Sequence, residues 1–71
     1  MSKIKVLFFE DLVKHIGGES EFKGKTSEEI WNMLTDAEEA LSEKFLKKGC
    51  NEVIRVCGTC IQDYADSMGI N

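Results

Sequence analysis

The strongest constraint on the fold is a long amphipathic segment that lies between two short runs of β-branched and apolar residues. Thr26-Ser27-Glu28-Glu29 is a capping-box pattern, in which the first and last side chains satisfy each other's backbone N–H groups. Gly49 supplies a stop signal at the other end. Between them, apolar residues repeat at helical spacing, while most acidic residues fall on the opposite face. The sequence therefore predicts a helix over residues 27–48, with a buried stripe formed by Ile30, Leu34, Ala37, Leu41 and Phe45.

The runs on either side of this helix have the composition of strands. Residues 3–9 alternate polar and apolar side chains and then become fully apolar, and residues 53–56 read Val-Ile-Arg-Val. A strand, a helix and a second strand in this order form a βαβ unit whose strands are parallel. The apolar character of residues 53–56 also predicts burial on both faces, as in a parallel sheet.

Shorter elements complete the expected order. Residues 10–16 have apolar side chains at helical spacing and end at Gly17-Gly18, and residues 19–25 predict a loop or a weak edge strand. Apolar residues between positions 61 and 68 again repeat at helical spacing. Because Thr59 and Gln62 form a second capping-box pattern, this last helix is predicted to begin at Cys60. Residues 1–71 are thus expected to form a single small α/β domain, a βαβα unit with a long crossover helix.

Size and charge restrict assembly and function. A chain of 71 residues buries a thin core, and its three cysteines cannot all pair within one molecule, so we expect a homo-oligomer. Nine basic against thirteen acidic residues argue against nucleic acid as a partner. The longest apolar stretch, residues 4–9, is too short to span a membrane, and no signal-peptide pattern precedes it. These features predict a cytoplasmic protein without a membrane partner.

Cys57-Gly58-Thr59-Cys60 is the motif that carries chemistry. This C-x-x-C lies between a strand and a helix, where free backbone N–H groups and the helix dipole stabilise a thiolate. We interpret Cys57 as the nucleophile and Cys60 as the thiol that resolves its adduct, with Gly58 permitting a tight turn and Thr59 capping the helix. Cys50 is either a third thiol of a relay or a bystander. In a reducing cytosol the motif favours redox or sulfur chemistry over a structural disulfide.

Two other interpretations of the cysteines stay open. If they are small buried residues, the acidic face of the 27–48 helix makes the protein a non-catalytic binding or inhibitory module. A zinc ion requires four ligands, and Cys50, Cys57, Cys60 and His15 contain no second C-x-x-C or C-x-x-H pair. We therefore predict no metal and no other cofactor within one chain, which leaves only a metal site between subunits. Whether the protein is an enzyme is not decided by its sequence.

Residues 45–60, together with Tyr64 and the ending Met68-Gly69-Ile70, resemble the DsrE-like family and the C-terminal domain of the YedF-type selenium-metabolism proteins. The shared pattern is a helix, a glycine, a strand, a Cys-Gly-Thr-Cys motif and a helix that ends near Gly-Ile. The resemblance implies a flavodoxin-like three-layer fold and an oligomer. It also implies that Cys57 receives sulfur or selenium as a persulfide-type adduct, with Cys60 as the second matching position. A sulfur-relay protein or another protein would then be the partner.

The first part of the chain has a second, weaker resemblance. Residues 3–9, the turn at Gly17-Gly18, a possible strand at residues 20–23 and the helix from Thr26 are similar to the opening of MoaD-type ubiquitin-like sulfur carriers. This implies an α+β β-grasp fold as the alternative, in which residues 61–68 would also be a strand. Those carriers act through a C-terminal Gly-Gly tail, whereas this chain ends Gly-Ile-Asn. The helical period of residues 61–68 favours the βαβα fold.

Overall fold

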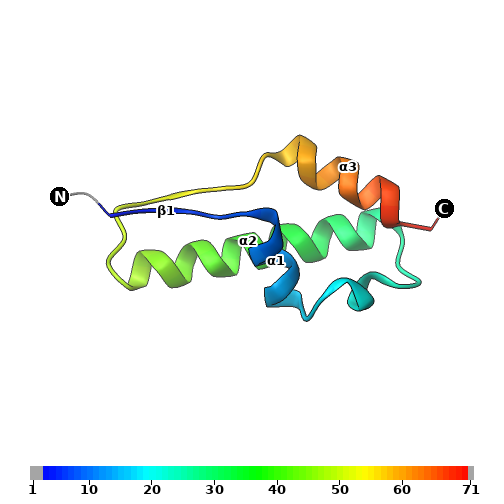
Figure 1. The fold of residues 1–71 in the computed structure, drawn as a ribbon, viewed down its shortest axis with the longest axis horizontal. Coiled ribbons are helices and arrows are strands. Elements are labelled where there is room, and N and C mark those ends of the chain that lie inside the picture. The colour runs from blue at the N-terminus through cyan, green and yellow to red at the C-terminus, as the bar shows by residue number, and fades with distance from the viewer. Residues whose placement is uncertain (1–2, 71) are drawn as a thin grey trace.

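The computed structural model describes residues 3–70, which contain helices and two parallel strands. The elements are β1 (Ile4–Val6), α1 (Phe9–Ile16), the short 3-10 helix η1 (Glu19–Phe22), α2 (Ser27–Lys47), β2 (Glu52–Ile54) and α3 (Gly58–Met68). Figure 1 shows α2 running the length of an elongated molecule, with the strands beside its C-terminal half and α3 beside its N-terminal half. This mixture of helix and parallel strand confirms a small α/β fold.

The capping box predicted at the start of α2 is present. The Glu29 N–H donates to the Thr26 hydroxyl at 3.2 Å, and the Thr26 N–H donates to the Glu29 carboxylate at 3.1 Å. These bonds lower the pKa of Glu29, because they stabilise its charged form. At the other end Lys48 is the C-cap, and Gly49 adopts a φ of 103° that favours glycine. The predicted helix is therefore confirmed to within one residue.

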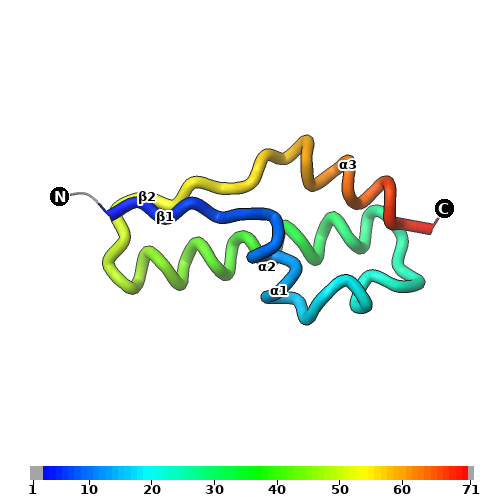
Figure 2. The backbone as a smooth tube through the Cα atoms, in the orientation of Figure 1, coloured from blue at the N-terminus to red at the C-terminus, as the bar shows by residue number. Residues whose placement is uncertain are grey.

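The strands pair in parallel, as the βαβ order predicts. Ile4 lies beside Glu52 and Val6 lies beside Ile54. Asn51 fixes this register, since its N–H donates to the Lys3 carbonyl at 2.7 Å and its side-chain oxygen accepts the Lys3 N–H at 2.9 Å. Figure 2 shows the two strands side by side before β2 continues toward α3.

Both strands are shorter than the sequence predicts. Phe9 belongs to α1 and not to a strand, because the Asp11 carboxylate accepts the Phe8 N–H at 2.8 Å and starts the helix there. The expected burial of residues 53–56 on both faces is also wrong. Ile54 is 46% exposed because α2 covers one face of the sheet and no element among residues 3–70 covers the other.

The core lies between α2 and the elements packed along it. Its buried apolar side chains are Leu7, Leu12, Phe22, Ile30, Leu34, Ala37, Leu41, Ile61 and Ala65. Four of the five residues of the predicted α2 stripe are in this set, and the fifth, Phe45, packs against it half-buried. Leu46 and Trp31, the other large apolar residues near the ends of this helix, lie off the stripe and are exposed.

Residues 19–22 do not form the weak edge strand that the sequence allows as one of two possibilities, and residues 61–68 form the predicted helix. Residues 19–22 form η1, whose Phe22 is buried against the edge of the Tyr64 ring, with the ring centres 5.6 Å apart. Residues 61–68 are helical in α3. The additional strands that a β-grasp fold requires are therefore missing from the part of the chain that the structure describes.

The C-terminal end of α3 is hydrogen-bonded to the chain at the start of α2. The Ile70 N–H donates to the Lys25 carbonyl at 2.9 Å, and Ile70 forms a parallel bridge with Thr26. Gly69 is needed for this approach, since a side-chain carbon there would collide with the Ser27 backbone. Both ends of α3 are thus held, the last turn by α2 and the first turn by the chain leaving β2.

Candidate thiol site

Cys57 lies at the junction between the extended chain after β2 and the first turn of α3. It is the N-cap of the helix, with φ −57° and ψ 132°, and Gly58 is the first helical residue. Figure 1 shows α3 starting beyond the carboxyl end of the sheet, where parallel α/β sheets generally place their sites. The structure therefore places the motif at the strand-to-helix junction that the sequence predicts.

The helix begins two residues earlier than the sequence predicts, with Cys57 in place of Thr59 as its N-cap. Thr59 is not the N-cap, because it already lies in the first helical turn. The Gln62 side chain does not complete a capping box with it and instead donates to the Asp66 carboxylate at 3.0 Å. Since Cys57 takes the N-cap position, its sulfur is the side-chain atom nearest the free N–H groups of the first turn.

The helix start perturbs the Cys57 thiol, whose side chain is exposed. The backbone N–H groups of Cys60 and Thr59, followed by the Thr59 hydroxyl, lower the pKa of Cys57 by favouring its thiolate. The neutral side chain makes no capping hydrogen bond of standard geometry, so this stabilisation acts on the charged form of the sulfur. Thr59 thus contributes to the site, but as a hydrogen-bond donor and not as the predicted cap.

Cys60 is perturbed in the opposite direction. The negative charge of Cys57 is the largest cause of its raised pKa, followed by desolvation, a side-chain hydrogen bond to Cys57 and the charge of Asp63. Cys60 is exposed like Cys57, so burial does not distinguish the two sulfurs, and both cysteines are free. The pair therefore consists of one thiol that ionises readily and an adjacent thiol that keeps its proton.

The other predicted members of the site lie apart from it or have no special role in its geometry. Cys50 is half-buried at the opposite end of β2, and seven extended residues at about 3.3 Å each put it roughly 20 Å from Cys57. Gly58 does not have a positive φ, and the space around it is open, so the turn does not require glycine. His15 lies at the surface of α1. The structure thus brings together Cys57, Thr59 and Cys60.

Glu38 is the residue that sequence reasoning missed. Its charge predicts a place with the other acidic residues on the solvated face of α2, yet it is only 7% exposed and its carboxylate accepts the Val56 N–H at 2.9 Å. Val56 directly precedes Cys57, so this bond ties the approach to the thiol turn to α2. The helical spacing contained the signal, because position 38 is four residues after Leu34 and lies on the same face.

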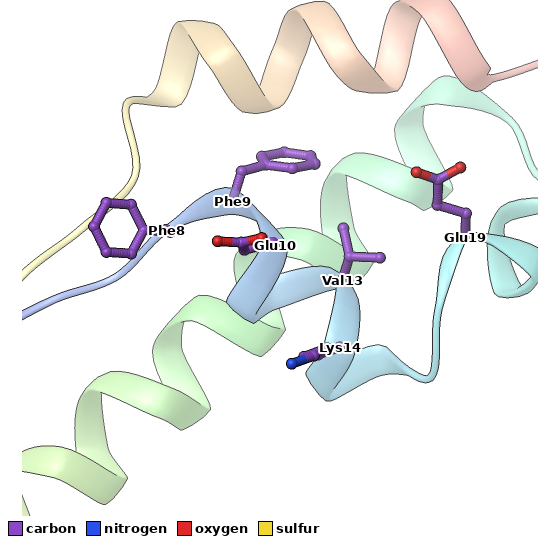
Figure 3. Close-up of a pocket in the computed structure, with 6 residues that line it drawn as sticks. All are labelled: Phe8, Phe9, Glu10, Val13, Lys14 and Glu19. Carbon is purple, nitrogen blue, oxygen red and sulfur yellow. The ribbon is translucent and has the colours of Figure 1, made fainter.

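An apolar groove opens at the end of β1. It has a volume of about 540 Å³ and is lined by Phe8, Phe9, Glu10, Val13, Lys14 and Glu19. In Figure 3 the Phe9 ring lies under α3. The contact of Phe9 with Tyr64 of α3 agrees, with ring centres 4.5 Å apart. The groove therefore borders the same edge of the sheet as the thiol pair.

Within residues 3–70, no group of three or more His, Cys, Asp or Glu side chains is gathered to hold a metal ion. No helix in the described chain is both long and apolar enough to cross a membrane. Comparison of the chain with protein-family models, curated proteins and solved structures gives no match. The geometry of the thiol pair is thus the basis for assigning a function.

Proposed function

We propose that the protein accepts and transfers sulfur, or its heavier analogue selenium, through Cys57, with Cys60 as the resolving thiol. The observation that carries this proposal is the asymmetry of the pair. Cys57 is an exposed N-cap residue whose pKa is lowered, and the adjacent Cys60 has a raised pKa. A thiolate is the form of cysteine that attacks sulfur, so only one of the two sulfurs is prepared to react first.

The loading step uses a persulfide donor. The Cys57 thiolate attacks the outer sulfur of the donor, the donor's S–S bond breaks, and the donor leaves as a thiolate. Cys57 then carries a persulfide, and no electrons are gained or lost overall because one S–S bond replaces another. Cys57 is exposed, so the outer sulfur of the donor can reach it.

The release step uses Cys60. Its thiolate attacks the Cys57 sulfur, a Cys57–Cys60 disulfide forms, and the outer sulfur leaves as hydrosulfide with the electron pair of the broken bond. The raised pKa of Cys60 keeps this thiol protonated beside the Cys57 charge, so it attacks only after it has lost its proton. An external thiol reductant is then required to return the disulfide to two thiols.

The fold supports a wider proposal. A parallel strand pair, a long crossover helix and a cysteine at the strand-to-helix junction are the features expected of a relative of the DsrE-like family. We therefore propose that the βαβα unit represents part of a flavodoxin-like arrangement. Because persulfide exchange with free thiols requires a reducing compartment, we also propose a cytoplasmic location and a thiol-bearing relay protein as donor or acceptor.

Intact mass spectrometry after exposure to a low-molecular-weight persulfide tests the proposal. We expect Cys60→Ser to retain one added sulfur and Cys57→Ser to add none. Cys50→Ser is the matched control and should load like the wild type, since Cys50 lies at the far end of β2. Equal loading of Cys57→Ser would overturn the assignment. With zinc present, a stoichiometric zinc mass that disappears in either single variant would instead assign the thiols to a metal site.

A further inference from the structure

The positions of the two cysteines at the start of α3 suit them to form a disulfide with each other. Cys57 is the N-cap and Cys60 is the third residue of the helix, and the side chain of an N-cap residue reaches the backbone N–H of that third residue. The Cys60 N–H is accordingly the largest cause of the lowered pKa of Cys57. Both side chains are exposed and free. A dithiol of this kind can give two electrons to a disulfide outside the protein.

The charged side chains on α3 are all acidic. Residues 56–71 contain no lysine or arginine, whereas Asp63 and Asp66 lie exposed on the helix. Asp63 comes three positions after Cys60, a spacing that puts two side chains about 5–6 Å apart on one face of a helix. The raised pKa of Cys60 agrees, because the charge of Asp63 is among its causes after the charge of Cys57. A negative charge therefore lies beside the second thiol of the pair.

The part of α2 that contacts this region adds a further acid and no cation. The contact is made by Glu38, whose carboxylate accepts the N–H of Val56. The lysines of α2 begin only at Lys44, six residues beyond Glu38, which is about 9 Å along the helix axis. Arg55 is the last basic residue of the chain, so its one positive charge is set against the carboxylates of Glu38 and of the two α3 aspartates. A molecule that approaches the pair therefore meets net negative charge.

We infer that the thiol pair also reduces disulfides, and that Asp63 makes it prefer cationic and neutral disulfides to anionic ones. This inference rests on the same Cys57 thiolate as the proposed function, but the substrate and the product differ. The Cys57 thiolate attacks one sulfur of the substrate, the substrate S–S bond breaks, and one thiolate leaves with its electron pair. Cys60 then loses its proton to solvent and attacks the Cys57 sulfur, and the second thiolate leaves. The pair is oxidised by two electrons to a disulfide, and the substrate is reduced to two thiols.

Acid-quenched mass spectrometry of reduced protein carrying Cys50→Ser measures how fast the pair becomes a disulfide. The probes are cystamine, 2-hydroxyethyl disulfide and 3,3′-dithiodipropionate, which are cationic, neutral and anionic. Each rate is divided by the rate of the same probe with N-acetylcysteine amide, which removes the intrinsic reactivity of the probe. We expect the normalised rate for cystamine to exceed that for dithiodipropionate by about twofold or more at about 0.1 M salt. The two rates should converge at about 1 M salt, where charges are screened beyond about 3 Å.

Asp63→Asn should bring the ratio of the cystamine and dithiodipropionate rates toward one, and circular dichroism checks that each variant is folded. Asp66→Asn is the matched control, because it removes the same charge from an exposed position about 9 Å from Cys60 along the helix axis. It should lower the ratio less. Equal lowering in the two variants would overturn the inference, because Asp63 would then not set the preference.

Two other results would also overturn the inference. One is a pair that forms no disulfide with any probe, and the other is a ratio at or below one in the protein that keeps Asp63. Persulfide loading of Cys57, measured on the same protein, separates these results from the proposed function. Loading without disulfide reduction refutes only this inference, whereas disulfide reduction without loading refutes only the proposed sulfur transfer.

Discussion

Replacing Glu38 by alanine tests how α2 holds the turn that presents Cys57. The Glu38 carboxylate is buried and accepts the Val56 N–H at 2.9 Å, one residue before the thiol. Its removal leaves that N–H half-buried and unpaired, which costs about 1–3 kcal/mol. We take about 2 kcal/mol as the expected loss in the free energy of unfolding. For a domain of this size each kcal/mol lowers Tm by about 4–8 °C, so Tm should fall by about 8–16 °C.

Two controls separate the hydrogen bond from the charge and from the helix. Glu38→Gln keeps the shape and an acceptor oxygen, so the hydrogen bond persists. We expect its free energy of unfolding to fall by less than about 1 kcal/mol, because a neutral acceptor bonds more weakly than a charged one. Glu39→Ala changes the exposed neighbour and should stay within about 0.5 kcal/mol of the wild type. Thermal and urea unfolding followed by circular dichroism measure all three. If Glu38→Ala is as stable as Glu39→Ala, the bond does not hold the turn and the reasoning is refuted.

Two stability predictions concern the ends of α2 and α3. Thr26→Ala removes one half of the capping box and should lower the free energy of unfolding in urea by about 1 kcal/mol. Thr35→Ala, within the helix, is the control and should change it very little. Equal losses in the two variants would show that the cap does not stabilise α2. Gly69→Ala forces a methyl group against the Ser27 backbone and should cost about 1–3 kcal/mol, whereas Gly58→Ala has open space and should be neutral or slightly stabilising. A neutral Gly69→Ala would contradict the close approach of α3 to α2.

The parts of the fold that could be predicted are those fixed by local sequence. Thr26, Glu29 and Gly49 define α2 because caps and stops act within one turn of the helix. The β-branched runs identified the parallel pair, since strand composition and the intervening helix suffice for that. Their lengths could not be predicted, because the Asp11 bond to the Phe8 N–H ends the first run early.

The parts that could not be predicted depend on tertiary contacts. Both Cys57 and Thr59 can serve as the N-cap of α3 on local sequence alone. The structure uses Cys57, and this start agrees with burial of Ile61, which is 1% exposed. Glu38 looked like one more surface acid, since its partner lies 18 residues away at Val56. The position of the thiol pair at a strand-to-helix junction was predictable from the sequence, but the separate roles of its neighbours required the geometry.

Cys57 also links the site to stability. Its pKa is lower in the folded state than in the unfolded chain, where a thiol titrates near about 8.5. The contribution of its thiolate to stability is therefore present above the unfolded pKa and is lost as pH falls through the folded one. This pH dependence of stability is expected only of the reduced protein, because a disulfide has no thiolate to titrate.

The most direct test of the central claim, that Cys57 is the thiolate of the pair, is the pH dependence of alkylation of each cysteine. It is measured by mass spectrometry of reduced protein carrying Cys50→Ser, which leaves two thiols. We expect the Cys57 midpoint to lie below that of an ordinary cysteine and the Cys60 midpoint to lie above it. Adding Cys57→Ser should lower the Cys60 midpoint, because the charge that raises it is gone. A Cys57 midpoint at or above that of Cys60 would contradict the claim.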